Sequence, residues 1–118
     1  MPEVHLIWKK SCDTCRRYKK QLDAWGVRYT EREMNAAPLD AAEIRALIGA
    51  RPVKDFLNPR NVRYRELGLK DEVPDADRAA ALIAEENNLL RRPVLQVDDV
   101  ILTGNDLPAA ARLLGITP

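Results

Sequence analysis

A short apolar strand that leads directly into a cysteine pair and an amphipathic helix is the feature that most constrains how this chain folds. Residues 4–8 are mainly apolar and predict a buried strand. The apolar side chains that follow have the spacing of one helical face, and they are Cys15, Tyr18, Leu22 and Trp25. Gly26 predicts the end of this helix, and the alternating start of residues 27–34 predicts a second strand. A strand, a helix and a strand in this order form a βαβ unit with parallel strands.

Three helices are predicted in the middle of the chain. The first covers residues 40–49, because Asp40 and Glu43 have the spacing of a capping box. The second covers residues 58–68, because it begins with an asparagine that can cap a helix and a proline suited to the first helical position. The third covers residues 74–88 and has apolar side chains at helical spacing.

The C-terminal part of the sequence predicts a hairpin and a last helix. Residues 94–97 and 100–102 are apolar and flank two aspartates, a pattern typical of two antiparallel strands joined by a tight turn. The last helix is expected to begin at Asn105 or Asp106 and to end at Gly115. The order is strand, helix, strand, then helices, then strand, strand, helix. This order predicts an α/β fold with a mixed sheet.

Composition and charge narrow the functional classes. The 118 residues, of which 46% are hydrophobic, suffice for one domain with its own core. Nineteen basic and eighteen acidic residues give a net charge of +1, which provides no overall attraction to nucleic acids or to membranes. The sequence has no apolar run of membrane-spanning length and no signal-peptide pattern. We therefore expect a cytoplasmic monomer without a direct nucleic-acid or membrane partner.

Cys12 and Cys15 form a C-x-x-C pair where the first strand gives way to the helix. Unpaired N–H groups at a helix N-terminus stabilise a thiolate. Nearby cations are expected to add to the same field, and they are Lys9, Lys10, Arg16 and Arg17. Cys12, the outer residue, is the expected nucleophile, with Ser11 beside it as a supporting residue. Cys15 lies one turn further in on the apolar stripe, and it is expected to resolve a mixed disulfide on Cys12.

Two other roles remain open for the cysteines. Two cysteines and one histidine cannot complete a four-ligand zinc site of Cys and His within one chain, so a metal site would need carboxylate ligands or a second subunit. Alternatively, the cysteines are inert and are packed for their size. The position between strand and helix, the spacing and the flanking cations favour redox chemistry. We expect neither a bound metal nor a bound cofactor.

Arg91-Arg92-Pro93 comes directly before the first strand of the hairpin. Proline cannot donate to a sheet ladder, so it belongs at the start of a strand, and its peptide bond can be cis. In a redox fold this proline faces the cysteine loop, so Arg92 can pair with an oxyanion or lower a thiol pKa. Arg91 is expected to be a solvated surface charge. Arg60 is expected in the first turn of its helix, where a cation opposes the helix dipole and favours an anionic partner.

Four motifs keep their order along nearly the whole chain. They are the C-x-x-C pair, N-P-R-N at residues 58–61, L-L-R-R-P-V at residues 89–94 and G-N-D at residues 104–106. With these motifs the chain resembles the ArsC/Spx family of arsenate reductase-related proteins. The resemblance implies a thioredoxin-like fold in a single domain.

The resemblance also implies how the domain is divided. The whole chain, residues 1–118, corresponds to one ArsC/Spx-like domain. Its thioredoxin-like core comprises residues 1–34 and 89–118, and residues 35–88 form a helical insertion.

The resemblance further implies site roles. Cys12 corresponds to the reactive thiol, Arg60 and Arg92 correspond to anion-binding arginines, and Pro93 corresponds to a cis-proline. Asn105, in the G-N-D motif, is a candidate supporting residue. Arsenate reductases have a third anion-binding arginine just after the last strand, where this chain has no arginine.

Two functions follow from these residues. The first is a thiol–disulfide oxidoreductase that acts on a disulfide or another small oxidised substrate and is regenerated by glutathione, thioredoxin or glutaredoxin. The second is a redox-sensing regulator similar to Spx, which binds the α subunit of RNA polymerase, in which a disulfide between Cys12 and Cys15 changes the affinity for that partner. The two functions differ in whether the protein turns over.

Overall fold

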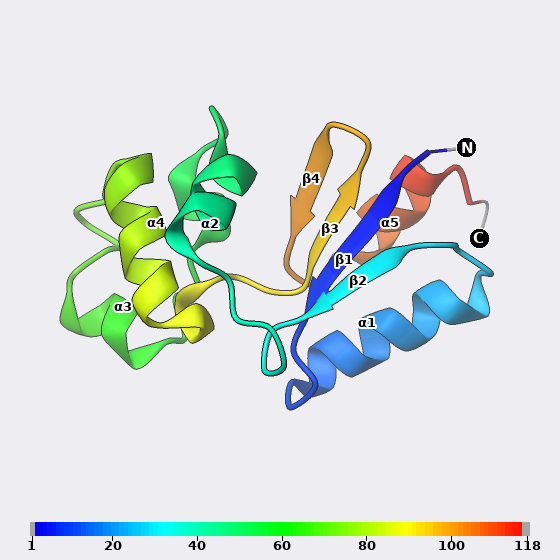
Figure 1. Ribbon diagram of the computed structural model, residues 1–118, viewed down its shortest axis with the longest axis horizontal. Helices are drawn as coiled ribbons and strands as arrows, with labels where there is room; N and C mark the ends of the chain where they lie inside the picture. The colour runs from blue at the N-terminus through cyan, green and yellow to red at the C-terminus, as the bar shows by residue number, and fades with distance from the viewer. Residues whose placement is uncertain (1, 117–118) are drawn as a thin grey trace. The chain divides into compact units, whose positions relative to one another are not determined.

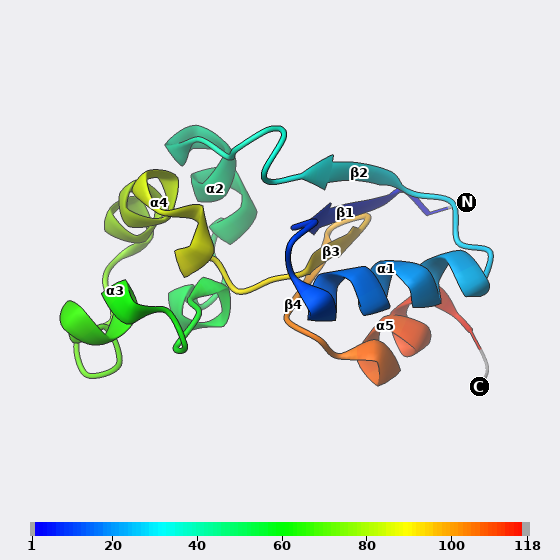
Figure 2. The same cartoon turned by 90° about the horizontal axis from the view of Figure 1, so that it is seen from below.

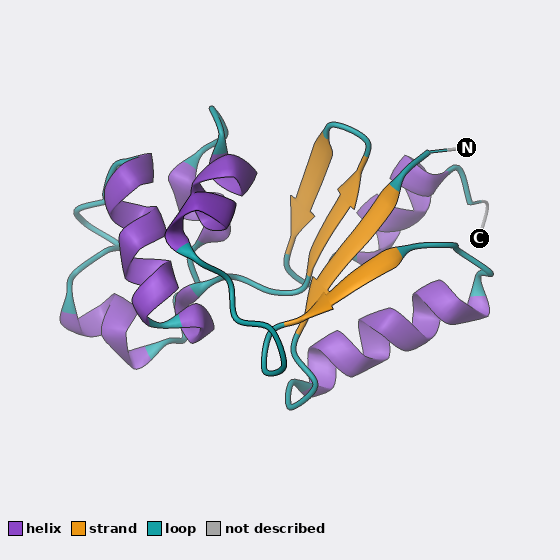
Figure 3. Ribbon diagram, in the orientation of Figure 1, coloured by secondary structure: helices purple, strands orange, loops and turns teal. Residues whose placement is uncertain are grey.

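The structure is a computed structural model that describes residues 2–116. The chain forms two compact units. The sheet unit consists of the residues up to Ala37 together with those from Arg92 onward, and the helical unit is Pro38–Arg91. Figure 3 shows the strands gathered in the sheet unit. Both cysteines belong to this unit.

The sheet unit contains one four-stranded sheet within the described residues. Its strands are β1 (Val4–Trp8), β2 (Thr30–Glu33), β3 (Val94–Val97) and β4 (Val100–Thr103), in the spatial order β2-β1-β3-β4 (Figure 1). β1 and β2 are parallel, whereas β3 is antiparallel to both β1 and β4. The predicted βαβ unit, hairpin and mixed sheet are therefore confirmed.

The second strand is shorter than the sequence predicts. It begins at Thr30, because Val27 and Tyr29 instead pack against the apolar core before the strand starts. Gly26 has a φ of 73° and allows the chain to leave α1, as predicted. The N–H of Val27 then donates to the carbonyl of Leu22 at 3.1 Å. The predicted strand at residues 27–34 thus covers both the connection after α1 and the shorter strand β2.

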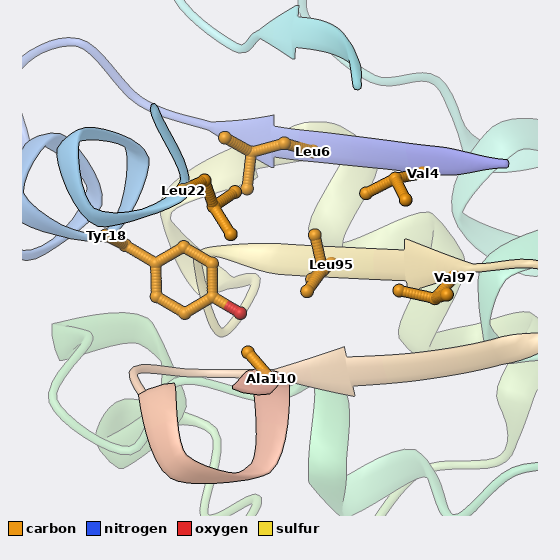
Figure 4. Packing of buried hydrophobic residues seen from close by; sticks show 7 residues of the cluster. All are labelled: Val4, Leu6, Tyr18, Leu22, Leu95, Val97 and Ala110. Carbon is orange, nitrogen blue, oxygen red and sulfur yellow. The ribbon is translucent and has the colours of Figure 1, made fainter. Parts of the chain in front are cut away.

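Helices α1 (Asp13–Ala24) and α5 (Leu107–Leu114) lie on the same side of the sheet (Figure 2). The apolar stripe predicted for α1 is buried at Cys15, Tyr18 and Leu22. The buried members of the core cluster are Val4, Leu6, Tyr18, Leu22, Leu95, Val97 and Ala110 (Figure 4). This packing fixes the N-terminal end of α1 relative to the end of β1.

The helical unit contains α2 (Ala41–Ile48), η1 (Val53–Phe56), α3 (Val62–Glu66), α4 (Ala76–Glu85) and η2 (Asn87–Leu89). The predicted capping box begins α2: the N–H of Glu43 donates to Asp40 Oδ1 at 2.8 Å, and the N–H of Asp40 donates to Glu43 Oε1 at 3.2 Å. α2 and α4 pack against each other. Of the helices in residues 2–116, none combines the length and the hydropathy needed to cross a membrane.

The predicted start of the second helix in this unit is wrong. α3 begins at Val62, and its N-cap is Asn61, whose side chain accepts from the N–H of Arg63 at 2.9 Å. Asn58 instead bonds elsewhere in the unit, because its N–H donates to the Leu89 carbonyl at 2.8 Å. Arg60 consequently lies in a turn before the helix, so the argument that it opposes the dipole of a first helical turn does not hold.

Two valines that face each other across the hairpin give a matched test of this core. Val97 is 4% exposed and its cross-strand partner Val100 is 47% exposed. Val97→Ala should lower the free energy of unfolding by about 2 kcal/mol, because it removes buried methyl groups and leaves a cavity. Val100→Ala should change it by about 0.5 kcal/mol or less. Urea denaturation followed by circular dichroism measures both, and equal losses would contradict the packing described.

Candidate active site

Cys12 is the N-cap residue of α1. Figure 1 shows the turn that connects β1 to this helix. The N–H of Cys12 donates to the carbonyl of Lys9 at 3.0 Å, which closes this turn. The backbone of Cys12 is extended, with φ −101° and ψ 114°, and its Sγ accepts from the N–H of Cys15 at 3.4 Å. The sulfur therefore occupies the position at which serine or aspartate oxygens usually cap a helix.

Cys15 is fully buried, with 0% of its surface exposed. Burial raises the pKa of the Cys15 thiol to about 12, because the charged form loses its hydration. The hydrogen bond and the charge of Cys12 raise this pKa as well, whereas the Lys9 backbone and the positive charge of Arg92 oppose the rise. Cys15 is thus held as a neutral thiol at neutral pH.

Cys12 is partly exposed, and its pKa lies below the ordinary value for cysteine. Burial by itself raises the pKa of Cys12. Hydrogen bonds from the backbone and the side chain of Cys15 outweigh that effect, together with a hydrogen bond and the positive charge of Arg92. The two sulfurs therefore differ in the direction of their pKa shifts, and Cys12 is the one with thiolate character.

Arg92, which bonds to Cys12, stands two residues before β3. The peptide bond between Arg92 and Pro93 is cis, and Pro93 is buried directly before the strand. The Pro93 carbonyl accepts from the N–H of Gly104 at 2.9 Å, which ties the start of β3 to the end of β4. Figure 2 shows this end of β3 near the start of α1. The structure thereby brings Cys12, Cys15, Arg92 and Pro93 together in the sheet unit.

Arg16, one of the cations that flank the cysteines in sequence, has contacts other than Cys12. Arg16 forms an ion pair with Asp13 and donates to the carbonyl of Lys10 at 2.9 Å. Within the described part of the chain, the cation whose hydrogen bond and charge lower the pKa of Cys12 is Arg92. The field expected from the sequence neighbours is therefore supplied mainly by Arg92, two residues before β3 and 80 residues from Cys12.

Glu33, at the end of β2, positions the cysteine loop and was not identified from the sequence. Its carboxylate accepts from the backbone N–H of Lys10 at 2.8 Å, of Asn35 at 3.1 Å and of Ala36 at 2.8 Å. Burial raises the pKa of Glu33, but these donors outweigh it and lower the pKa below its ordinary value. The sequence indicated this role only by a charged residue at the end of a strand in which polar and charged residues predominate.

The remaining predicted site residues have separate positions. Ser11 is exposed and its Oγ accepts from Asn35 Nδ2 at 3.3 Å. Asn105 is exposed in the bend before α5, and the cap of that helix is Asp106, which accepts from the N–H of Ala109 at 3.0 Å. Arg60 is exposed and belongs to the helical unit.

Metal binding was the alternative role of the cysteines. In residues 2–116, no three side chains of His, Cys, Asp or Glu are grouped so that they could hold a metal ion. Both cysteines are free thiols. The arrangement is suited to thiol chemistry, because it contains a thiolate-prone sulfur and a second sulfur one helical turn away.

This chain is similar to several known proteins. A family profile described as the ArsC family matches residues 7–109. The protein YusI of Bacillus subtilis (strain 168) is 30% identical over 103 residues, which are 84% of this chain and 87% of that protein. A global transcriptional regulator Spx of Staphylococcus epidermidis is 27% identical over 114 residues, which are 94% of this chain and 86% of the regulator.

A solved structure extends the likeness to three dimensions. The crystal structure of an ArsC family related protein from Bacteroides fragilis superposes with a TM-score of 0.77 at 26% sequence identity. The match covers 94% of this chain and 97% of that one. The thioredoxin-like α/β fold predicted from the sequence is therefore confirmed.

The opposite pKa shifts predict different reactivities for the two thiols. Iodoacetamide should modify Cys12 with a rate that titrates below the ordinary pKa of a free cysteine, and should modify Cys15 far more slowly in the folded protein. Arg92→Met should move the Cys12 midpoint to higher pH, because a hydrogen bond and a positive charge are lost. Arg91→Met is the matched control and should leave the pH midpoint of Cys12 alkylation unchanged. Mass-mapped alkylation across a pH series measures this, and similar rates at both sulfurs would contradict the site.

Proposed function

The chain belongs to the ArsC family, and from this premise and the geometry at Cys12 we propose that it is a thiol–disulfide oxidoreductase. The observation that carries the proposal is the pairing of a partly exposed Cys12 of lowered pKa with a fully buried Cys15 one helical turn away. A nucleophilic thiol must be accessible and carry thiolate character, whereas a resolving thiol can stay buried and neutral until the mixed disulfide forms. Cys12 is the proposed nucleophile and Cys15 the proposed resolving thiol.

The proposed reaction begins at the thiolate of Cys12. Its sulfur attacks one sulfur of a substrate disulfide, a mixed disulfide forms, and the other substrate sulfur leaves as a thiolate that takes up a proton. Cys15 then loses its proton and attacks the Cys12 sulfur, which releases the second substrate thiol. The substrate has gained two electrons, and the protein holds a disulfide between Cys12 and Cys15.

The oxidised protein needs a thiol reductant to complete the cycle. Glutathione, a thioredoxin or a glutaredoxin would return two electrons to the disulfide, and a reducing compartment such as the cytoplasm contains these thiols. Arg92 is the proposed binding group for a carboxylate or an oxyanion, because its guanidinium fork can hold two oxygens at once. From the family resemblance we also propose that Arg60 binds an anion.

We propose a disulfide rather than arsenate as the substrate. Arsenate reductases have an additional arginine after the last strand, and this chain has Thr103, Gly104 and Asn105 in that region. The second cysteine of the pair also offers an internal resolving thiol, which a disulfide substrate uses directly.

A second candidate function is a redox-sensing regulator. The observation that favours it is the likeness to the Spx regulator over 94% of this chain. In this function the protein would not turn over: oxidation would form the disulfide between Cys12 and Cys15, and the affinity for a partner would change. The α subunit of RNA polymerase is the partner that the resemblance to Spx proposes.

Substitution of each cysteine separates the two proposed steps. Cys12→Ser should abolish reduction of a model disulfide, because no nucleophile remains. Cys15→Ser should retain the first attack and accumulate a mixed disulfide on Cys12, because nothing resolves it. Turnover is followed with glutathione and glutaredoxin as the reductant, and the adduct is identified by intact mass. A Cys15→Ser protein that turns over normally and carries no adduct would refute the resolving role.

Replacement of Arg92 by lysine distinguishes the two candidate functions. An oxidoreductase that binds a carboxylate through the guanidinium should lose about tenfold to a hundredfold in rate with Arg92→Lys, because the second of two charge-assisted hydrogen bonds is lost. A sensor needs mainly the positive charge and should tolerate this change. Arg91→Lys is the control. Absence of turnover in the parent protein, together with a disulfide-dependent partner that tolerates Arg92→Lys, would favour the regulator.

A further inference from the structure

The outer side of α1 carries a basic stripe that begins about one helical turn after Cys12. Four side chains at helical spacing line a shallow hollow of about 370 Å³, and they are Asp13, Arg16, Arg17 and Lys20. We call Arg16, Arg17 and Lys20 the basic stripe. With one carboxylate against three cations, the lining has a net charge of +2. The buried stripe of α1 faces the core, so the basic stripe faces solvent.

The positions of these cations are not those at which positive charge stabilises the helix dipole. Cations stabilise a helix near its C-terminus, yet α1 has no basic residue in its last turn. Arg16 is paired with Asp13, whereas Arg17 and Lys20 form no ion pair with any described residue. Lys19, on the same helix, shows the contrast, because it pairs with a β2 glutamate at 3.1 Å. Two unpaired cations therefore remain on one side of the helix that Cys12 caps.

The dimensions of the helix relate these cations to the reacting sulfur. A helix rises 1.5 Å per residue, so Arg16 lies about 6 Å and Lys20 about 12 Å along the axis from Cys12. An extended peptide advances about 3.3 Å per residue. A peptide whose cysteine reacts with Cys12, and which lies along α1, therefore places its second and fourth residues from that cysteine beside the stripe.

We propose that the disulfide attacked by Cys12 belongs to an acidic, extended peptide segment of a protein substrate, which lies along the basic stripe. Carboxylates two and four residues from the substrate cysteine face Arg16, Arg17 and Lys20. The inference rests on the proposed oxidoreductase function, and the exchange is the one given above. The Cys12 sulfur bonds to the cysteine sulfur of the peptide, and the other sulfur of the substrate leaves as a thiolate.

The test compares two nine-residue peptides that have one central cysteine in a mixed disulfide with 2-nitro-5-thiobenzoate. One peptide has aspartate at the second and fourth positions on both sides of the cysteine, and the other has asparagine there. Release of the coloured thiolate measures the rate of the first attack. The aspartyl peptide should react about tenfold faster at about 20 mM salt, and the ratio should fall to less than about threefold at about 0.3 M salt, where charges are screened.

Charge-removing variants locate the effect. The double variant Arg17→Gln, Lys20→Gln should abolish most of the preference for the aspartyl peptide while it keeps the rate with the asparaginyl peptide. Arg28→Gln is the matched control, because Arg28 is exposed and lies beyond the far end of α1. It should keep the full preference.

The outcomes separate this inference from the proposed function. Equal rates for the two peptides with the parent protein would overturn the inference and leave the oxidoreductase function standing. A preference that survives the double variant would also overturn it, because another surface would then read the acidic residues. Failure of both peptides to react would overturn the oxidoreductase function itself, and the inference with it.

Discussion

The hydrogen bond from the N–H of Cys15 to the sulfur of Cys12 is the interaction on which the site depends. It caps α1, and it also stabilises negative charge on the sulfur. A thiolate accepts this hydrogen bond better than a thiol does. Ionisation of Cys12 therefore strengthens the cap of α1, and the cap in turn lowers the pKa of Cys12. Any reaction that consumes the thiolate weakens the cap at the same time.

Two segments that are distant in sequence hold this interaction in place. The loop after β2 holds the turn before Cys12, because Glu33 accepts the N–H of Lys10 and of its own following loop. The segment before β3 supplies Arg92, whose hydrogen bond and positive charge lower the pKa of Cys12. Since β2 and β3 both pair with β1, the sheet order fixes where the two segments meet the cysteine loop. The chemistry of Cys12 is therefore a property of the sheet as well as of the C-x-x-C pair.

Local patterns allowed the strand at residues 4–8 and the helix after it to be predicted, because periodicity and capping residues are read over short distances. The error at Asn58 has the opposite cause. Asn58 and Asn61 are equally good caps by type, but a hydrogen bond from Asn58 to the Leu89 carbonyl decides between them, and that contact is not local. The role of Glu33 was missed for the same reason. Arg92 is the exception, because the proline that follows it indicated from the sequence that it faces the cysteine loop, and its contact with Cys12 is tertiary.

In the proposed exchange, the causes of the pKa of Cys15 bear on how a buried thiol would act second. Burial is the largest cause of its rise to about 12, but the hydrogen bond and the charge of Cys12 contribute, and the charge of Arg92 opposes them. Once Cys12 is part of a mixed disulfide, its negative charge is gone, and the charge of Arg92 acts on the remaining thiol. Loss of the Cys12 charge removes one of the smaller causes that raise the pKa of Cys15, whereas the burial remains. In the proposed exchange, the charge of Arg92 would favour the thiolate of Cys12 in the resting protein and that of Cys15 in the mixed disulfide, because it lowers the pKa of both thiols.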